Sequence, residues 1–331
     1  MKVCIVGAGV VGLTTALELQ KQFRDVDITI LAHKFNAETT SDGAAGLFMP
    51  YLAFRGPTEA ITNKWLQDAF LFYQKLIDEN CGVVPTTGYL LSSVPSYDFG
   101  TNSMQSISPE YRLTTDTEMR HLPLPFESSI YASTMVIACR KFLPWCIEKL
   151  KKSGVEIKQQ TVNDFAPLIS QYNAVFNCSG LGARYLCKDT EILPVRGQIV
   201  QVHAPWVKHY YVFNNQNNYI IPCGYDGIVT LGGTADVGSF DTTVIPKIAN
   251  SIVDECSQLL PNLQYAPRVR NWVGLRPFRK EARVELEKVD KSVLIHNYGH
   301  GGSGVTAAPG TSKYAVELFC DFHQAGFRLK L

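Results

Sequence analysis

The most constraining feature of this 331-residue chain is a glycine turn close to its start, Gly7-Ala8-Gly9-Val10-Val11-Gly12. A short apolar run precedes it, and the residues that follow have helical rather than strand spacing. Strand, tight turn and helix in this order form the context in which Gly-x-Gly-x-x-Gly binds a dinucleotide. Gly7 allows the sharp turn, Gly9 lets the backbone approach a pyrophosphate, and Gly12 lets the helix pack closely on the strand. The pattern favours a dinucleotide site over a plain glycine-rich turn, and it leaves the chemistry open.

Composition excludes several other classes of protein. With 46% hydrophobic and 18% charged residues, the chain is typical of a soluble globular protein long enough for two domains. A net charge of +1 gives no indication of a nucleic-acid surface, and no apolar run is long enough to cross a bilayer. The apolar start runs directly into the glycine turn, which argues against a signal peptide. Nine scattered cysteines without a CxxC pair favour a reducing compartment and buried, unreactive thiols.

The end of the second expected strand, 26–31, lacks the acid that often holds a ribose in dinucleotide folds. His33 and Lys34 stand there, and Lys34 can either meet a phosphate or remain in a solvated loop. The next stretch, 38–47, is rich in hydroxyl and small side chains. Such a loop holds phosphates, ribose or a flat ring, or it is an ordinary Ser/Thr turn, and its spacing alone does not separate the two.

The middle of the chain predicts a second domain inserted into the first, because strands recur between helical stretches. A polar and aromatic loop at 203–219 is either a lid or a surface loop. Expected helices lie at 13–23, 59–80, 140–151, 245–259 and 310–324. Expected strands lie at 87–92, 155–160, 173–180, 193–202, 219–222 and 229–233. A polar loop is expected after 87–92, through about Ser108, and strand and turn at 129–137. The strands 219–222 and 229–233 are expected to pair in an antiparallel sheet.

Two further features point to a ligand. Arg276 lies between an apolar strand and Pro277, where an unpaired guanidinium would be costly. It is either salt-bridged to a local acid or a bidentate clamp for a substrate carboxylate. A second glycine turn, 299–304, follows the last strand and leads into the last helix. Two such turns suit a long ligand, and flavin adenine dinucleotide (FAD) matches that description better than a nicotinamide dinucleotide.

Nine ordered motifs resemble the D-amino-acid oxidase and D-aspartate oxidase family along essentially the whole chain. They are VGAGVVGL (6–13), TTSDGAAGL (39–47), NCSGLGAR (177–184), PVRGQI (194–199), APWVKH (204–209), YIIP (219–222), TLGG (230–233), GLRP (274–277) and HNYGHGGSGVT (296–306). The resemblance implies an α/β fold, in which a Rossmann-like FAD-binding domain is interleaved with an α+β substrate domain built on an antiparallel sheet. The FAD-binding domain would comprise 1–53, 133–182 and 278–331, and the substrate domain 54–132 and 183–277.

The same resemblance implies the roles of individual residues. Arg276 would grip the substrate α-carboxylate with help from Tyr219, and the carbonyl of Gly302 would accept a hydrogen bond from the amine. The residues that would line FAD are Gly7, Gly9, Val10, Val11, Gly12, Lys34, Thr39, Thr40, Ser41, Gly46, Leu47, Val162, Ser179, Gly301, Gly302, Ser303, Gly304, Val305 and Thr306. No metal is implied. The implied reaction is hydride transfer from the α-carbon to FAD without a protein base, giving a 2-oxo acid, ammonia and hydrogen peroxide from a D-amino acid and O2.

Three departures from the family pattern bear on substrate and cofactor. His33 stands at the ribose position, and Asn215 stands where D-amino-acid oxidases have a lid tyrosine. Val212 and Ala235 replace the arginines of the acid-preferring branch, and Lys208, His209 and Arg279 are candidate replacement cations. The sequence therefore favours neutral or broad D-amino acids, with D-aspartate or D-glutamate as the alternative. A non-catalytic FAD-binding protein and a nicotinamide-dependent dehydrogenase are the alternatives of other classes.

The last residues, Arg328-Leu329-Lys330-Leu331, match only the last two residues of the peroxisomal Ser-Lys-Leu address. Because an oxidase that forms peroxide suits that compartment, we expect a peroxisomal location, with the cytoplasm as the alternative. The expected partners are the small-molecule substrate and oxygen. A homodimer is compatible with the sequence, and neither a nucleic acid nor a membrane is expected.

Overall fold

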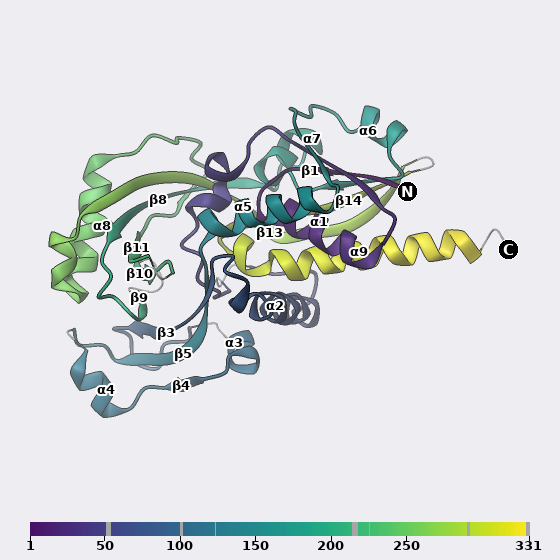
Figure 1. The fold of residues 1–331 in the computed structure, drawn as a ribbon. Coiled ribbons are helices and arrows are strands. Elements are labelled where there is room, and N and C mark those ends of the chain that lie inside the picture. The colour runs from purple at the N-terminus through teal and green to yellow at the C-terminus, as the bar shows by residue number, and fades with distance from the viewer. Residues whose placement is uncertain are drawn as a thin grey trace.

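The computed structural model describes residues 1–50, 54–99, 102–122, 124–213, 218–224, 226–289 and 292–328. Its strands form one mixed sheet whose two ends differ in character (Figure 1). One end is parallel, in the order β14 (Ser292–His300), β7 (Ala174–Asn177), β1 (Lys2–Val6), β2 (Asp27–Ala32) and β6 (Glu156–Gln159). This end contains the first glycine turn.

Helices cover both faces of the parallel end because alternate residues of a strand point to opposite faces. Val3 and Ile5 of β1 pack with α1 (Val10–Gln22), α2 (Glu59–Gln74), α5 (Cys139–Lys152) and α9 (Gly304–Arg328) in the largest core cluster. Cys4 and Val6 face the other way, toward α6 (Ala166–Gln171). This doubly covered sheet is the Rossmann-like part of the predicted fold.

The other end of the sheet is mostly antiparallel. Its strands are β4 (Tyr111–Leu113), β5 (Ser128–Ile137), β3 (Val83–Ser92), β9 (Tyr210–Phe213), β10 (Asn218–Pro222), β11 (Ile228–Gly232), β8 (Leu193–His203) and β13 (Arg268–Val289), and the β3–β9 pair is parallel. Helix α8 (Pro246–Leu259) packs on this end, and α3 (Asn102–Ile107), α4 (Asp116–His121) and the two-residue strand β12 (Asp236–Val237) complete it. Helix α7 (Ala183–Leu186) packs instead against the parallel strands. The predicted antiparallel pairing of 219–222 with 229–233 is confirmed as β10–β11.

Strand β13 joins the two ends of the sheet. Its first half pairs with β8, and its second half pairs with β14 after a register shift between Phe278 and Arg283. Phe278 lies opposite His300, the last residue of β14. Arg276 therefore lies next to the second glycine turn, although 23 or more residues separate them in the chain.

Several element boundaries differ from the sequence prediction. The polar loop before Ser108 contains α3, and the region 129–137 is strand throughout rather than strand and turn. The helix expected at 59–80 ends at Gln74, where a short 3-10 turn follows, and the last helix starts at Gly304 despite Pro309 inside it. Part of the expected lid is strand β9, inside the sheet, and Asn215 lies outside the described residues.

All nine cysteines carry free thiols, and seven of them are buried. Burial raises the pKa of Cys4 and Cys178 to about 12, which leaves both thiols protonated and unreactive. Among the described residues, no helix is both long and apolar enough to cross a membrane. The same residues contain no cluster of three or more side chains suited to hold a metal ion.

Candidate active site

One cavity of about 1230 Å³ runs along the carboxyl ends of the parallel strands and under the antiparallel sheet. It is larger than the roughly 300–1,000 Å³ of most small-molecule sites, so it suits a long ligand together with a second, smaller one. Every residue that the sequence predicted to contact cofactor or substrate lines this cavity, except Gly12. The fold thus brings together segments from the start, middle and end of the chain.

The first glycine turn is a close contact between three backbone segments. Gly7 has a φ of +114°, and a Cβ there would lie 2.3 Å from the carbonyl oxygen of Cys178. A Cβ on Gly12 would lie 2.0 Å from the carbonyl oxygen of Gly7. Gly12 therefore acts behind the cavity wall, as predicted, by letting the helix approach the strand.

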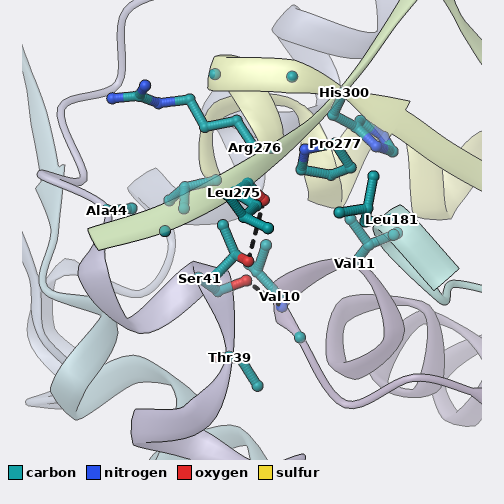
Figure 2. A pocket seen from close by; sticks show the side chains of 18 of the residues that line it. Val10, Val11, Thr39, Ser41, Ala44, Leu181, Leu275, Arg276, Pro277 and His300 are labelled. Carbon is teal, nitrogen blue, oxygen red and sulfur yellow. Dashed lines mark hydrogen bonds between the residues drawn. The ribbon is translucent and has the colours of Figure 1, made fainter. Parts of the chain in front are cut away.

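Helix α1 presents an uncapped N-terminus to the cavity. Its N-cap residue, Gly9, provides no side-chain hydrogen bond, and its first turn contains no acid. Within the described part of the chain, a Cβ on Gly9 would meet only the hydroxyl oxygen of Ser41, at 3.2 Å. That hydroxyl accepts a hydrogen bond from the Val10 amide at 3.1 Å (Figure 2). The remaining N–H groups and the helix dipole form a site for an anion.

The hydroxyl-rich loop is a wall of the cavity, braced against β13. Thr40 donates a hydrogen bond to the carbonyl of Leu275 at 3.2 Å. Asp42 is buried and forms an ion pair with Arg270 at 2.6 Å. Thr39, Gly46 and Leu47 line the cavity as well. This placement favours the ligand-binding interpretation of the loop over an ordinary turn.

The far end of the cavity lies beside β2 and β6. His33 and Lys34 are exposed there, and His33 Nδ1 lies 2.9 Å from the hydroxyl of Thr161, next to Val162. Among the described residues that line the cavity, Glu38 carries the only carboxylate. Lys34, Arg276 and Arg279 supply cations, so the cavity has more positive than negative side chains. Such a balance suits a pyrophosphate and a substrate carboxylate.

The second glycine turn brings another helix N-terminus to the same cavity. Gly301–Ser303 form a 3-10 turn that continues directly into α9. Gly302 is exposed while Gly301 and Ser303 are buried. The backbone of Gly302 is therefore the part of this turn that faces the open cavity.

His300, at the start of this turn, is buried against Phe54, with ring centroids 6.1 Å apart, and its Nε2 lies 2.9 Å from the hydroxyl of Thr311. Burial lowers its pKa from 6.5 to about 4. The unfolded chain therefore binds this proton more tightly, and stability is lost as the pH falls from 6.5 toward 4.

Through His300, the native protein should lose about 2 kcal/mol of unfolding free energy between pH 7.5 and 5.0. We expect His300→Gln to abolish this part of the loss, which urea denaturation would measure. His121→Gln, at an exposed histidine of α4, is the control. Equal pH dependence in all three proteins would contradict the assignment.

Arg276 and Tyr219 lie over glycines that leave room for their side chains. A Cβ on Gly197 would lie 2.2 Å from the Arg276 guanidinium, and one on Gly232 would lie 1.9 Å from the Tyr219 ring. Arg276 Nη1 donates to the carbonyl of Thr234 at 2.9 Å, and no ion pair joins Arg276 to any acid that the structure describes. Among the described residues, the alternative in which Arg276 is salt-bridged to a local acid is therefore wrong.

Tyr219 is a hydrogen-bond donor at neutral pH. Burial raises the pKa of its hydroxyl, and the nearby Arg276 guanidinium only partly opposes that rise. The hydroxyl therefore stays protonated beside the Arg276 guanidinium, with which it forms a hydrogen bond. An arginine and a tyrosine hydroxyl together form a suitable site for a carboxylate. Sequence reasoning missed the roles of Gly197 and Gly232, although an isolated glycine inside a strand pattern often marks such a close approach.

None of the three candidate replacement cations is available to a second substrate carboxylate. Lys208 and His209 do not line the cavity, and His209 Nδ1 instead lies 2.9 Å from the Thr87 hydroxyl. Arg279 lines it but pairs with Asp189 at 3.1 Å and Glu191 at 3.0 Å. Val212 and Ala235, where the acid-preferring branch has arginines, both line the cavity.

A family model described as FAD dependent oxidoreductase matches residues 2–318 of the chain. The protein belongs to this family. It is 34% identical to a D-amino acid oxidase of Dugesia ryukyuensis over 97% of this chain and 98% of that protein. It is 32% identical to human D-aspartate oxidase over 96% of this chain and 94% of that protein. The FAD dependent oxidoreductase family thus accounts for nearly the whole sequence.

Solved structures show the same fold. Glycine oxidase from Geobacillus kaustophilus superposes with a TM-score of 0.78 at 20% identity, covering 96% of this chain and 93% of that one. The predicted fold class is confirmed, and FAD is the cofactor of the family. The residues present fit FAD, because two helix N-termini open on one long cavity and Gly9 leaves room for a pyrophosphate.

Proposed function

We propose that this FAD-dependent oxidoreductase is an oxidase of D-amino acids, with neutral or broadly varied side chains preferred. The observation that carries the proposal is Arg276, a half-buried cavity arginine that has no acidic partner among the described residues. Arg276, Tyr219 and Gly302 line one cavity. They provide donors for an α-carboxylate and an acceptor for an α-amine. The two curated relatives named above support the substrate class.

The cofactor would lie along the two glycine turns. The α1 N-terminus at Gly9 and Val10 would hold the pyrophosphate, and Thr39–Ser41, Leu47 and Val162 would line the ribityl chain and rings. The backbone of 301–306 would face the flavin. FAD, when bound, supplies a two-electron acceptor that O2 reoxidises with release of hydrogen peroxide. The division into an FAD-binding domain (1–53, 133–182, 278–331) and a substrate domain (54–132, 183–277) stays part of this proposal.

The side chains would bind and orient the substrate rather than remove its proton. Arg276 would hold the α-carboxylate through two parallel N–H···O bonds, and Tyr219 would donate a third. The Gly302 carbonyl would accept from the amine, which fixes which face of the α-carbon is presented. Glu38, the only carboxylate among the described cavity-lining residues, lies on the nucleotide side. A base is therefore not needed if the amine binds neutral and the α-hydrogen leaves as a hydride.

D-aspartate oxidase activity is the second candidate, because human D-aspartate oxidase is 32% identical. The geometry favours neutral substrates instead. Val212 and Ala235 supply no cation for a second carboxylate, and none of the described candidates Lys208, His209 and Arg279 is available to it. Leaving a buried carboxylate unpaired costs about 1–3 kcal/mol or more. Arg279 is already neutralised by Asp189 and Glu191.

A panel of amino acids tests the proposal by peroxide formation. We expect the yellow, FAD-loaded protein to oxidise D-alanine at least about 10-fold more efficiently than D-aspartate, in kcat/KM, since about 1.4 kcal/mol corresponds to tenfold. The L-enantiomers are the control and should be inert. Failure with neutral, basic and acidic D-amino acids alike would leave the non-catalytic flavoprotein as the better interpretation. A preference for D-aspartate would identify the acid-preferring branch. Flavin absorbance at one FAD per chain would exclude a nicotinamide-dependent dehydrogenase.

The location and the oligomeric state stay predictions. The ending Leu329-Lys330-Leu331 lies outside the described residues, and a peroxisomal address there is a sequence-based proposal. A homodimer is likewise a proposal that sedimentation would test.

A further inference from the structure

The segment 234–245 links β11 to α8 and forms the wall of the cavity beside Arg276. Its strand β12 pairs antiparallel with β8, with Asp236 opposite Arg196 and Val237 opposite Val195. Two large apolar side chains of the segment, Val237 and Phe240, line the cavity. They are nevertheless 68% and 49% exposed. Apolar side chains this exposed at a cavity wall are free to contact a ligand.

The segment is clamped from behind by a buried arginine. Alternate residues of β8 face opposite sides, so Val195 and Ile199 line the cavity while Arg196 does not. Arg196 is only 2% exposed, and its guanidinium donates to the carbonyls of Asp241 at 3.0 Å and Thr243 at 2.7 Å. Its Nη1 also lies 3.2 Å from the Asp236 carboxylate.

A second clamp holds the end of the segment. Gln198, fully buried, donates to the carbonyl of Ile245 at 2.8 Å and accepts from its amide at 3.0 Å. At the other end, Arg276 donates to the carbonyl of Thr234 at 2.9 Å. The segment is therefore held at both ends and in the middle, which makes it a fixed wall rather than a loose loop. The guanidinium proposed to bind the α-carboxylate is itself part of that wall.

We propose that Phe240 and Val237 contact the substrate side chain, so that D-amino acids with large apolar side chains are preferred. This inference rests on the proposed oxidase function. Phe240 is then a specificity-determining residue, and Arg196 is the positioning residue that holds it in place. The chemistry around it supports this assignment. Val195, Ile199 and Val212 add apolar surface to the same cavity. Arg196, the cation bonded to the back of the segment, does not line the cavity and is paired with Asp236.

The first experiment compares Phe240→Ala with the native protein, both loaded with FAD. We expect kcat/KM for D-phenylalanine to fall about 10- to 100-fold, as when several buried apolar atoms lose their contacts, while D-alanine changes less than about 3-fold. Tyr265→Ala is the control, because Tyr265 is an aromatic residue, 82% exposed, away from the cavity lining. Its kinetics should match those of the native protein.

A binding measurement gives a readout without turnover. The probes are 3-phenylpropionate and propionate, two carboxylates that lack the amine, and the signal is the change in flavin absorbance. We expect Phe240→Ala to weaken binding of 3-phenylpropionate at least about 10-fold and to leave propionate within about 3-fold. An equal effect on both probes would assign Phe240 to general cavity shape and overturn the proposal.

The positioning role of Arg196 is tested by a double-mutant comparison. We expect Arg196→Gln to raise KM for D-phenylalanine about 5-fold or more with kcat for D-alanine unchanged. Combined with Phe240→Ala, it should add little to the loss for D-phenylalanine, because both changes remove the same contact. Additive losses, or equal losses for both substrates, would reduce Arg196 to a structural role.

The substrate range of the native protein distinguishes failure of the proposed oxidase function from failure of the assignment of segment 234–245. If the native protein oxidises no D-amino acid, the proposed function itself fails. If it oxidises D-alanine and D-phenylalanine equally well, and Phe240→Ala changes both alike, the oxidase stands and the assignment of segment 234–245 is overturned.

Discussion

Arg276→Leu is expected to raise the Michaelis constant for a neutral D-amino acid about 100- to 10,000-fold while FAD stays bound. The native guanidinium offers two charge-assisted hydrogen bonds, each worth about 1.5–3 kcal/mol, and their loss corresponds to that range. Leucine is apolar and shorter than arginine, so it leaves the carboxylate unpaired and does not crowd Gly197. The native guanidinium packs so closely there that a Cβ on Gly197 would lie 2.2 Å from it. Initial-rate kinetics and the flavin absorbance of the purified variant give the two measurements.

Two further variants sharpen this result. Arg276→Lys keeps the charge and loses the planar fork, so it should fall between the native protein and Arg276→Leu. Arg268→Leu removes an exposed arginine from the same strand, where it donates to Asn250 at 2.8 Å, and should leave the kinetics unchanged. An unaltered Michaelis constant for Arg276→Leu would remove Arg276 from the substrate site.

The second large effect is expected from Gly7→Ala, which should destabilise the protein by about 3 kcal/mol or more and abolish measurable FAD binding. The added Cβ would lie 2.3 Å from the Cys178 carbonyl oxygen, and the φ of +114° is one that alanine rarely adopts. Relief of the clash requires β1 and the end of β7 to separate, which would move the α1 N-terminus. Urea denaturation and quenching of FAD fluorescence measure the two consequences.

Gly154→Ala provides a matched control for backbone conformation. Gly154 also has a positive φ, +85°, but within the described structure a Cβ there would meet nothing within 4 Å. This variant should lose only about 1 kcal/mol and keep FAD affinity. If both variants lose stability equally, the cost lies in φ alone, and the close contact of Gly7 with Cys178 has no special importance.

The features that depend only on neighbouring residues could be predicted from the sequence. The β1–turn–α1 unit, the β10–β11 pair and the glycine turn before α9 each lie within short segments, where apolar periodicity and glycine spacing carry the signal. Boundaries were less accurate. Helix α9 starts six residues before the expected Gly310, because the glycine turn passes directly into it and Pro309 is accommodated.

The substrate side of the cavity depended on pairings between distant strands. Arg276 lacks an acidic partner among the described residues because β13 runs beside β8, where Gly197 leaves space, and no local pattern specifies that register. The same holds for Arg196, which donates to the carbonyls of Asp241 and Thr243, 45 and 47 residues further along the chain.

By itself, the sequence determined the nucleotide-binding turn, the family resemblance and the identity of the residues in the site. Only the tertiary structure decided that Gly7 meets Cys178, that the candidate cation Arg279 is already paired, and that Phe240 lines the cavity. The physical reason is that a turn is set by the conformations of adjacent residues. A free guanidinium or an exposed apolar wall instead results from which distant segments the packed sheet brings together.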